Sequence, residues 1–532
     1  MPKHAIVRLS YRSVVVGCIT PKETPKKKSG TMLLLWLVLL TFLVLKIWLR
    51  KKYTYFRRYG IPYLPTSSWS PMGNLGQLLF LRISFGDLFR QLYADPRGGH
   101  AKVVGFFIFQ TPALLVRDPE LIRQILVKNF NSFLNRYESA DMGDSMGALT
   151  LPLAKYHHWK ESRQCMSQLF TSGRMRDVMY PQMCNVAIDL ENYLNRKLKD
   201  QTERVLPLGR MCQLYTTDVT GNLFYSLDVG GLRRGCSQLL KKTKELFKTD
   251  PRKVLDFMIV FFLPKWTNLM KPKVFSEDYA QYMRNLVEEH QEPKKGDLIN
   301  QLQHFQLTRS SNHYSQHPDF IASQAGIILL AGFETSSALL GFTLYELAKA
   351  PNIQDRLRRE LCEAFISSTL LSYDTLMALP YLKMVCLEIL RLYPAAAFVN
   401  RECTSPESEG FNLHPHVDFV VPPGMPAYIS ILGLHRDEKY WPEPNRFDPE
   451  RFAPERLKDI IPMTYIPFGA GPHGCIGSRL GILQLKLGIA HILKLYWVEI
   501  CKRTIPEIRF NPKSFMLESK NEIYLRFCRD TL

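Results

Sequence analysis

Residues 467–477 read PFGAGPHGCIG, and these eleven positions hold four glycines, two prolines and the single cysteine Cys475. Glycines permit positive φ angles and a close approach of the backbone to a neighbour, and a cysteine thiolate is a strong, soft metal ligand. A helical pattern, LGILQLKLGIAHILKLY, follows at 480–496. The loop indicates either a metal-binding thiolate or a buried free cysteine in a tight turn, and taken alone it does not decide between them.

The composition describes a large globular chain. It has 532 residues, of which 46% are apolar and 12% aromatic, so it can bury a sizeable core. Its formal charge of +20 is concentrated at the N-terminus, where residues 1–60 hold thirteen Lys and Arg against the single acid Glu23, leaving +8 for the other 472 residues. Because no helix-turn-helix, finger or RNP-type pattern accompanies this charge, we expect no nucleic-acid partner.

The cysteines argue against a disulfide or zinc scaffold. They are eleven, an odd number, scattered from Cys18 to Cys528, and they form no Cys-x-x-Cys pair. Neither a disulfide framework nor a zinc ribbon is indicated by this spacing. We therefore expect the body of the protein to lie in a reducing compartment.

A transmembrane anchor is predicted at residues 32–49. This stretch is apolar apart from Thr41 and Lys46, and its 18 residues are just enough to span a bilayer. A cleaved signal peptide is the alternative, but the following RKKYTYFRRYG lacks the small residues of a cleavage site. The basic flanks, four residues against five, do not orient the segment. Residues 1–31 form a basic extension, and we expect some or all of the mature protein to begin at Met32.

The rest of the chain is predicted to be a proline-rich linker followed by one large domain. Residues 50–66 are basic and then proline-rich, and should act as a semi-rigid spacer before a domain at 67–532. Apolar residues recur at helical spacing over 183–194 and over the long stretch 319–349, whereas 102–118 has a strand-like pattern. The predicted fold class is mainly α with small β-sheets.

The loop pattern Phe468-x-x-Gly471-x-x-x-Cys475-x-Gly477 resembles the haem-binding loop of the cytochrome P-450 superfamily. The resemblance implies the cytochrome P-450 fold as a single large haem domain behind the anchor. It also implies haem b (iron protoporphyrin IX) as cofactor, with the Cys475 thiolate as the axial metal ligand. Phe468, Gly471 and Gly477 would then belong to the cofactor-binding loop.

A second resemblance is AGFETSS at 331–337, which corresponds to the oxygen-activation helix of that family. A glycine inside a helix costs about 1 kcal/mol relative to alanine, and a hydroxyl can bond to its own helix carbonyls and loosen them, so a local widening is expected here. We expect Glu334 and Thr335 to relay protons during catalysis. The competing interpretation is a close helix crossing at small residues with a solvated Glu334.

A third resemblance joins Glu388-x-x-Arg391 to Arg451 in PERF. Glu and Arg three apart share a helix face, where they are often an ordinary surface pair worth a few tenths of a kcal/mol. The apolar neighbours of Glu388 favour burial instead, and a buried pair needs a further partner such as Arg451. The expected role of this network is structural support below the haem.

Four residues are predicted to hold the haem propionates. Trp159 and Arg163 lie one helical turn apart, and an arginine matches the geometry of a carboxylate. Arg401 corresponds to a second propionate-binding arginine of the family. His473 replaces the arginine more often found two residues before the cysteine, and we expect it to donate to a propionate more weakly and with pH dependence.

The sequences AGFETSSALLGFTLYELAKAP and RYGIPYLP look most like those of the insect microsomal branch of the superfamily. That branch is associated with xenobiotic metabolism, and hormone or lipid metabolism is the less favoured alternative. That branch implies an anchor in the endoplasmic reticulum membrane and a cytosolic catalytic domain. A mitochondrial membrane is the alternative, because the arm with Arg8 and Arg12 is acid-poor, although the anchor argues against it.

The predicted function is that of a membrane-bound haem-thiolate monooxygenase, which inserts one oxygen atom from O2 into a hydrophobic small molecule. Electrons would come from NADPH through a flavoprotein reductase, whose acidic surface Lys160 and Lys486 would attract. A haem-thiolate isomerase or dehydratase, and a non-catalytic haem or ligand carrier, remain as alternatives. The substrate is not decided by the sequence.

Two further patterns carry less weight. His313 and His317 have the one-turn spacing of a zinc pair, but Pro318 follows and no third ligand stands nearby, so we predict a loop. The apolar run at 257–266 is open to two interpretations, a segment that dips into the membrane surface or a part of the core.

Overall fold

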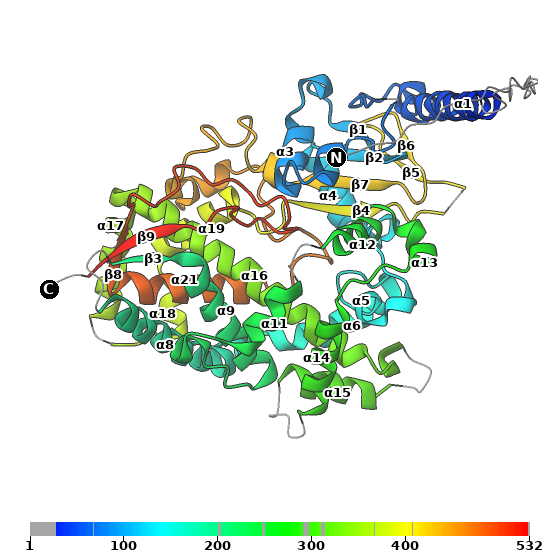
Figure 1. The fold of residues 1–532 in the computed structure, drawn as a ribbon. Helices are drawn as coiled ribbons and strands as arrows, with labels where there is room; N and C mark the ends of the chain where they lie inside the picture. Colours follow the sequence, from blue (N-terminus) through cyan, green and yellow to red (C-terminus); the bar gives the residue numbers. More distant parts are fainter. Residues whose placement is uncertain are drawn as a thin grey trace, which may run out of the picture.

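The computed structural model describes residues 28–529, apart from 68, 200–203, 247–249, 291–296, 310–313, 367 and 407. The chain is mostly helical with small sheets, which confirms the predicted fold class (Figure 1). The longer helices are α1 (Lys28–Tyr53), α3 (Phe85–Ala94), α6 (Tyr156–Ser167), α8 (Tyr180–Leu198), α9 (Leu208–Tyr225), α11 (Gln238–Leu246), α12 (Pro251–Phe262), α14 (Glu277–Glu288), α15 (Leu298–Leu307), α16 (Phe320–Lys349), α17 (Pro351–Phe365), α19 (Pro380–Leu392) and α21 (Ser478–Leu493). The shorter ones are α2 (Gly76–Leu79), α4 (Pro119–Arg123), α5 (Ser145–Ala148), α7 (Ser172–Arg174), α10 (Gly231–Arg234), α13 (Thr267–Met270), α18 (Tyr373–Ala378) and α20 (Ile431–Leu434).

The long helix α16 is the centre of the helical part. It is apolar around most of its circumference, as a helix surrounded by protein must be, and nearly all of its side chains are buried or half-buried. It packs against α9, α14, α19 and α21, and α16 and α21 run side by side in Figure 1. The helical patterns predicted at 183–194 and 319–349 are confirmed as parts of α8 and α16.

The largest sheet lies at the N-terminal side of the molecule. Its strands β1 (Val103–Ile108), β2 (Thr111–Val116), β7 (Pro426–Ser430) and β4 (Phe398–Glu402) follow the order β1-β2-β7-β4, with β2 and β7 parallel and the other pairs antiparallel. The strand-like pattern at 102–118 is thus the hairpin β1–β2. A second sheet has the order β3-β9-β8 (Val205–Pro207, Tyr524–Arg529, Tyr496–Glu499), and β5 and β6 (Phe411–Asn412, Val420–Val421) form a small pair.

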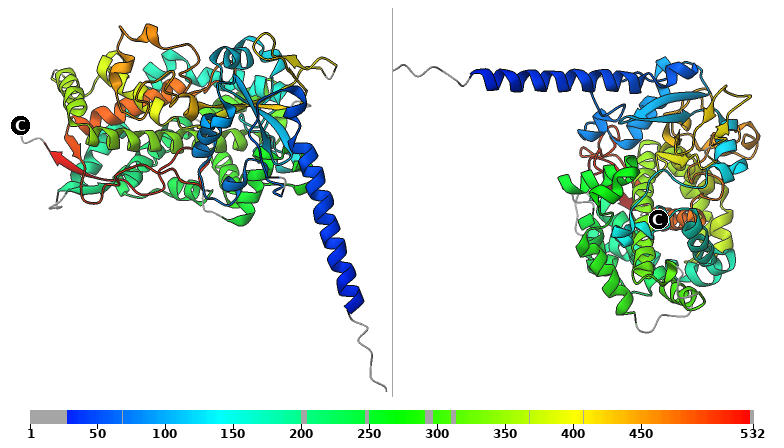
Figure 2. Two further views of the ribbon diagram at one scale, coloured as in Figure 1. Left: turned by 90° about the horizontal axis from the view of Figure 1, so that it is seen from above. Right: turned by 90° about the vertical axis from the view of Figure 1, so that its right-hand side faces the viewer.

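Helix α1 projects from the body into open space (Figure 2). Its large apolar side chains from Met32 to Trp48 are exposed. Helix α16 is also long and apolar enough to cross a membrane, but more than half of it is buried within the fold. The exposure of α1 therefore distinguishes an anchor-like helix from a core helix of similar composition.

The predicted spacer at 50–66 is not free-standing. Helix α1 continues to Tyr53, and Tyr53, Phe56 and Leu64 are buried in the same core as the first sheet. The Leu64 N–H donates to the Gly105 carbonyl at 2.8 Å, so the proline-rich stretch extends the edge of β1. Because these aromatic and aliphatic side chains gain more by burial than a solvated linker would, the segment attaches the anchor firmly to the body.

The run at 257–266 is mainly core. Its first part belongs to α12, where Met258, Ile259, Val260 and Phe262 are buried. Large exposed apolar side chains begin at the end of the run, with Trp266, and continue to Leu269 and Met270. The membrane-dipping interpretation is therefore wrong for most of the run, and exposed apolar surface occurs one turn later.

The proposed histidine pair is not assembled as a site in the described part of the chain. His313 lies outside the described residues. His317 follows a short 3-10 turn, and its Nδ1 accepts the backbone N–H of Asp319 at 3.1 Å. This local bond explains His317 as a loop residue, as predicted.

Candidate functional site: a thiolate loop beside a cluster of arginines

Cys475 lies in a hydrogen-bonded loop that leads directly into α21. The Cys475 N–H donates to the Phe468 carbonyl at 2.8 Å, and the Gly474 N–H donates to the Gly471 carbonyl at 2.9 Å. These bonds close the loop on itself, while the Cys475 side chain stays exposed. This solvent access favours a thiol that can bind a ligand over one that is packed away inside a tight turn.

Gly471 is required at its position by the backbone and by its neighbour. Its φ is +69°, and a Cβ added there would lie 1.9 Å from the carbonyl oxygen of Leu126. No side chain fits such a distance, so the loop packs directly on the main chain of residues 124–128. Gly477 differs, because a Cβ there would meet Phe170 at an ordinary 3.8 Å.

Three arginines from distant segments converge near this thiol. Arg163 belongs to α6 and Arg401 to β4, and Arg136 precedes α5 in irregular chain. Protein atoms closely surround the solvent-accessible Cys475 thiol, and this desolvation raises its pKa, while the Gly477 N–H and the charges of Arg163 and Arg136 lower it. Burial also lowers the pKa of all three guanidinium groups, to about 9 at Arg401. Because three guanidinium groups converge near one thiol, the site is strongly electropositive.

The charges of this cluster are not balanced by the protein. The carboxylate of Glu138 lies 3.9 Å from Arg136 Nε and accepts from Asn400 Nδ2 at 2.7 Å, so one acid faces three guanidinium groups. Three of the buried polar atoms without a hydrogen-bond partner in the described structure belong to this cluster, namely Trp159 Nε1, Arg401 Nε and His473 Nδ1. A ligand that brings two carboxylates would balance the charge and accept from the two donors, Trp159 Nε1 and Arg401 Nε. The residues present therefore fit the propionate edge of a haem.

His473 is oriented differently from the prediction. Its Nε2 lies 2.8 Å from the Leu134 carbonyl, which can only accept, so the ring proton is on Nε2 and Nδ1 is a bare acceptor. Burial, together with the charges of Arg136 and Arg401, lowers the His473 pKa to about 2. A neutral ring in this tautomer does not donate from Nδ1 to a carboxylate. Arg136, whose Nη2 donates to the His473 carbonyl at 3.3 Å, brings a guanidinium to this place instead.

The middle of α16 borders accessible space. Ala331 is exposed, although its helix is otherwise buried or half-buried as far as Lys349. The Thr335 hydroxyl donates to the Ala331 carbonyl at 2.7 Å, the bond to its own helix that the sequence predicts. Gly332 has a packing role, because a Cβ there would approach Thr220 of α9 to 2.9 Å. The competing interpretation of a helix crossing is thus right for Gly332, but it does not describe Glu334.

Glu334 is half-buried and faces the C-terminal loop, not Thr335. The Ser514 hydroxyl donates to Glu334 Oε1 at 3.2 Å. Burial raises the Glu334 pKa to about 8, the negative charge of Glu518 adds to the rise, and the bond from Ser514 opposes it. Glu334 is therefore largely a neutral acid at pH 7 and holds a proton next to the accessible part of α16.

The predicted network of Glu388, Arg391 and Arg451 is assembled and buried. Arg391 Nε and Nη2 donate to the two Glu388 oxygens at 2.7 Å each, and Arg451 Nε lies 3.5 Å from Glu388 Oε1. The remaining Arg391 donors reach the backbone carbonyls of His435, Pro444 and Arg446. Because Glu388 and all the side-chain donors of Arg391 are bonded, the network can join α19 to the chain before the cysteine loop without an unpaired buried charge.

One of the two predicted reductase contacts is wrong. Lys160 is exposed on α6. Lys486 is almost fully buried, and its Nζ donates to the carbonyls of Leu376 and Met377 at the end of α18. A lysine at that depth cannot meet a partner protein, because it is used to satisfy carbonyls inside the fold.

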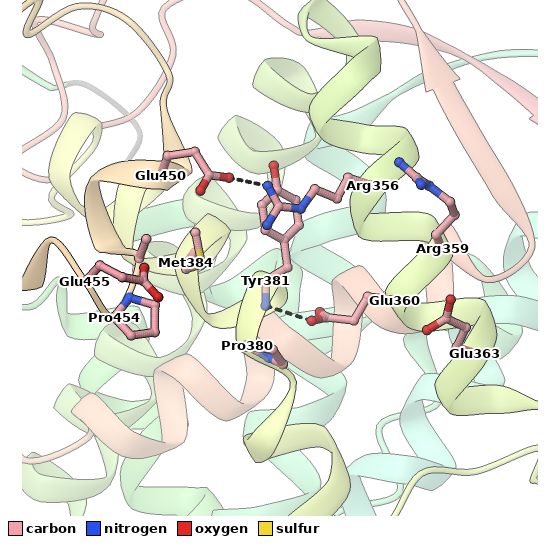
Figure 3. Close-up of a pocket in the computed structure, with 11 residues that line it drawn as sticks. Arg356, Arg359, Glu360, Glu363, Pro380, Tyr381, Met384, Glu450, Pro454 and Glu455 are labelled. Atoms are coloured by element: carbon pink, nitrogen blue, oxygen red, sulfur yellow. Dashed lines mark hydrogen bonds and ion pairs between the residues drawn. The ribbon is translucent and has the colours of Figure 1, made fainter.

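A cavity of about 450 Å³ lies elsewhere, between α17, α19 and residues 450–455 (Figure 3). Three of its charged groups, Arg356, Glu360 and Glu450, are bonded within the protein. Arg356 stacks on the Tyr381 ring at 4.0 Å and bonds to Glu450, and Glu360 accepts the N–H groups of Tyr381 and Leu382 at 2.7 and 2.8 Å. These contacts begin α19 and hold it to α17, so the cavity is separate from the thiolate site.

A mostly helical body, a glycine-bounded thiolate loop and a cationic cluster with unpartnered donors define a haem-thiolate protein. The sequence model of the cytochrome P450 family matches residues 64–526. The chain is 83% identical over 501 residues to probable cytochrome P450 6t3 of Drosophila melanogaster, covering 94% of this chain and 100% of the relative. It is 38% identical over 520 residues to probable cytochrome P450 6t1 of the same species, and 30% identical over 522 residues to cytochrome P450 6k1 of Blattella germanica. These two alignments cover 94% and 93% of the chain, and 97% of each relative.

The chain belongs to the cytochrome P450 family, and its relatives place it in the insect cytochrome P450 6 branch. It is accordingly an oxidoreductase of the haem-dependent monooxygenase type, which works with a redox partner on hydrophobic substrates.

Sequence reasoning missed three residues of this site. Arg136 and Glu138 stand in a segment with no periodicity and no motif, and Ser514 stands in an irregular loop near the C-terminus. Their importance comes from partners hundreds of residues away, such as His473 for Arg136 and Glu334 for Ser514.

We expect Gly471→Ala to abolish correct loop formation. The added methyl group would overlap a main-chain oxygen at a positive φ, and overpacking of this kind costs about 1–3 kcal/mol or more. A cost of about 1.4 kcal/mol already lowers the population of the correct loop about tenfold. Thiolate ligation shifts the Soret absorption band of the reduced carbon monoxide complex to the red of the position that histidine ligation gives. In haem-supplied, dithionite-reduced Gly471→Ala, this red-shifted band should fall at least about tenfold per folded molecule. Gly481→Ala is the control, because a Cβ there meets nothing within 4 Å. An unchanged band in Gly471→Ala would contradict the assigned geometry.

The raised pKa of Glu334 predicts a pH-dependent stability. Between the unfolded pKa near 4.5 and the folded pKa of about 8, the folded state binds more protons than the unfolded state. The contribution of Glu334 to the free energy of unfolding is therefore fully present at low pH and is lost as the pH rises through about 8. The thermal midpoint of the wild type should therefore fall relative to that of Glu334→Gln between pH 5 and pH 8. Parallel curves for the two proteins would show that Glu334 is ionised normally.

Proposed function

We propose that this protein is a membrane-anchored monooxygenase of the endoplasmic reticulum that receives NADPH-derived electrons through a flavoprotein reductase. The proposed substrate is a hydrophobic small molecule, a xenobiotic or, as a second possibility, a hormone or lipid. The observation that carries the proposal is the solvent-accessible Cys475 thiol beside three arginines whose charge is only partly offset by the carboxylate of Glu138. The relatives bear the names of insect cytochromes P450 but do not identify the substrate.

The proposed cofactor is haem b, which when bound supplies electron uptake and oxygen activation. Cys475 would be its thiolate ligand, on a loop formed with Phe468, Gly471 and Gly477. Arg163, Arg401 and Trp159 would hold the propionates, because Trp159 Nε1 and Arg401 Nε lack partners and the charges of Arg163 and Arg401 both act on the neighbouring His473. Arg136 joins this set in place of the missing arginine at position 473.

Glu334 and Thr335 have separate duties in this proposal. Thr335 lies on the accessible segment of α16 and can turn its hydroxyl from the Ala331 carbonyl toward a reacting group. Glu334 stores a proton, and its bond with Ser514 links it to the C-terminal loop. A proton released toward Thr335 would be replaced through that loop.

Two surfaces support membrane attachment. The first is the exposed apolar length of α1. The second consists of Trp266, Leu269 and Met270, which are exposed between the basic side chains of Lys265 and Lys271. Apolar residues flanked by lysines suit the boundary between headgroups and acyl chains. Because α1 is joined to the body through Tyr53 and Phe56, its direction also sets how the body faces the membrane.

The catalytic proposal is tested with Thr335→Ala. We expect this variant to retain the haem and the red-shifted carbon monoxide band but to consume NADPH with reductase while releasing peroxide, since the hydroxyl that directs protons is gone. Product formed per NADPH should fall several-fold, because electron uptake continues while proton delivery is no longer directed. Equal coupling in both proteins would remove Thr335 from the mechanism. Cys475→Ser is the loading control and should lose the band.

The alternatives predict different results in the same assay. A non-catalytic carrier would show the band without NADPH consumption for any substrate. An isomerase or dehydratase would convert a peroxide substrate without reductase, and such conversion by the wild type would favour it over the proposal.

The membrane proposal is tested by deleting residues 1–45, which spares Leu49 and Tyr53 because both are buried in the core. We expect the shortened protein to sediment with liposomes more weakly than the full chain but measurably. The double change Trp266→Glu and Leu269→Glu should abolish the remaining binding. Ile366→Glu is the control, since Ile366 is equally exposed at the end of α17. A fully soluble deletion protein would restrict membrane contact to α1.

A further inference from the structure

The buried network and the cysteine loop are joined by a residue that neither motif contains. His435 follows α20 directly and is completely buried. On one side it faces Arg391 of the network, and on the other it faces Ile466, which begins the loop. Forty-four positions separate His435 from Arg391 and thirty-one separate it from Ile466, so only the fold brings the three together.

The two ring nitrogens have opposite and unambiguous partners. The Ile466 backbone N–H donates to Nε2 at 2.9 Å, so Nε2 must carry a lone pair. Nδ1 lies 3.2 Å from the Arg391 carbonyl, which can only accept, so Nδ1 must carry the proton. The imidazole is therefore neutral and held in one tautomer by the main chain on both sides.

The surroundings keep the ring in that state. Burial and the positive charges of Arg391 and Arg436 together lower the His435 pKa to about 3, against the bonds to the Arg391 and Leu390 carbonyls. The Tyr465 ring stacks on the imidazole, with centroids 5.4 Å apart, and its hydroxyl donates to the Leu387 carbonyl at 2.9 Å. The charged groups near His435 thus repel a second proton, and Nε2 remains an acceptor across the physiological pH range.

The bond to Ile466 acts on the cysteine through a short path. The Ile466 carbonyl accepts from Gly469 at 2.9 Å, which forms the first turn of the loop. Two residues after Ile466, the Phe468 carbonyl accepts the Cys475 N–H at 2.8 Å. A displacement of Ile466 therefore changes both ends of the turn on which the thiol stands.

We propose that His435 is a positioning residue for the thiolate, because its neutral ring fixes Ile466 relative to the Glu388–Arg391 network and so sets where the loop presents Cys475. This inference rests on the proposed ligand role of Cys475. The reverse bond, in which the Arg391 side chain donates to the His435 carbonyl at 2.9 Å, makes the connection rigid in both directions.

Two substitutions separate the two ring bonds. The end of a glutamine side chain is as far from Cβ as Nε2, so His435→Gln can still accept from Ile466. The end of an asparagine is as far from Cβ as Nδ1, so His435→Asn can donate to Arg391 but does not reach Ile466. A purely structural role predicts that the two variants behave alike, whereas the proposal predicts that only glutamine preserves the loop.

The test uses the full-length, haem-supplied protein in its ferrous carbon monoxide form. We expect wild type and His435→Gln to keep the red-shifted Soret band of thiolate ligation. His435→Asn should lose this band several-fold faster, as it converts to the form with a blue-shifted Soret band in which the thiolate no longer binds the iron. His100→Asn is the matched control on an exposed histidine. A wild type without the band would overturn the ligand role of Cys475 itself. A wild type with the band and equal conversion in the Gln and Asn variants would overturn only the role of His435.

A second measurement requires no variant to fold. The Ile466 amide can be followed by hydrogen exchange, and Pro467 next to it has no N–H to confuse the assignment. We expect strong protection in the wild type and, where the variant folds, exchange about fivefold to tenfold faster in His435→Asn but not in His435→Gln. Exchange of Ile466 in the wild type at the rate of exposed amides would overturn the proposal.

Discussion

The excess of positive charge beside Cys475 is the constraint on which the rest of the site depends. Guanidinium groups are costly to bury without partners, and here Glu138 offsets only part of the charge of Arg136, Arg163 and Arg401. The proposed dianionic ligand would offset this charge, which accounts for an arrangement that is costly by itself. The charge also disfavours a second proton on His473, which explains why a histidine at that position cannot act as an arginine would.

The thiolate loop is held by contacts of a different kind. Gly471 lies against the main chain of Leu126, and Ile466 is bonded to His435, which faces the Glu388–Arg391 pair. These are interactions of backbone atoms with rigid or fully satisfied groups, so they leave the loop little freedom. A flexible side chain in either position would let the thiol shift, and metal ligands need a supporting shell that prevents such movement.

Much of this could be predicted from the sequence, because several features depend on short-range patterns. Helices α8 and α16 follow from apolar spacing, the hairpin β1–β2 from alternation, and the ligand loop from glycines at fixed distances from Cys475. Glu388 and Arg391 share a helix face, so their pairing is also local. The fold class and the family were accessible for the same reason.

The wrong predictions concern burial, which composition alone does not reveal. Lys486 looks like a surface lysine in the sequence, but α18 places two bare carbonyls over it. Residues 50–66 have the composition of a linker, but Tyr53, Phe56 and Leu64 find a hydrophobic surface on β1. For the run at 257–266 the sequence left two interpretations open, and burial in the fold favours the core for most of it, as the stacked rings of Phe85 and Phe262 illustrate.

The sequence by itself determined the type of chemistry, because a thiol in a glycine loop and an acid next to an alcohol in a helix are local arrangements. Only the tertiary structure decided how those groups are controlled. It brought Arg136 to His473, turned Glu334 toward Ser514 and placed His435 between Arg391 and Ile466. The physical reason is that pKa values and hydrogen-bond partners depend on distances of a few ångströms between residues that lie far apart in the chain, and no local pattern encodes those distances.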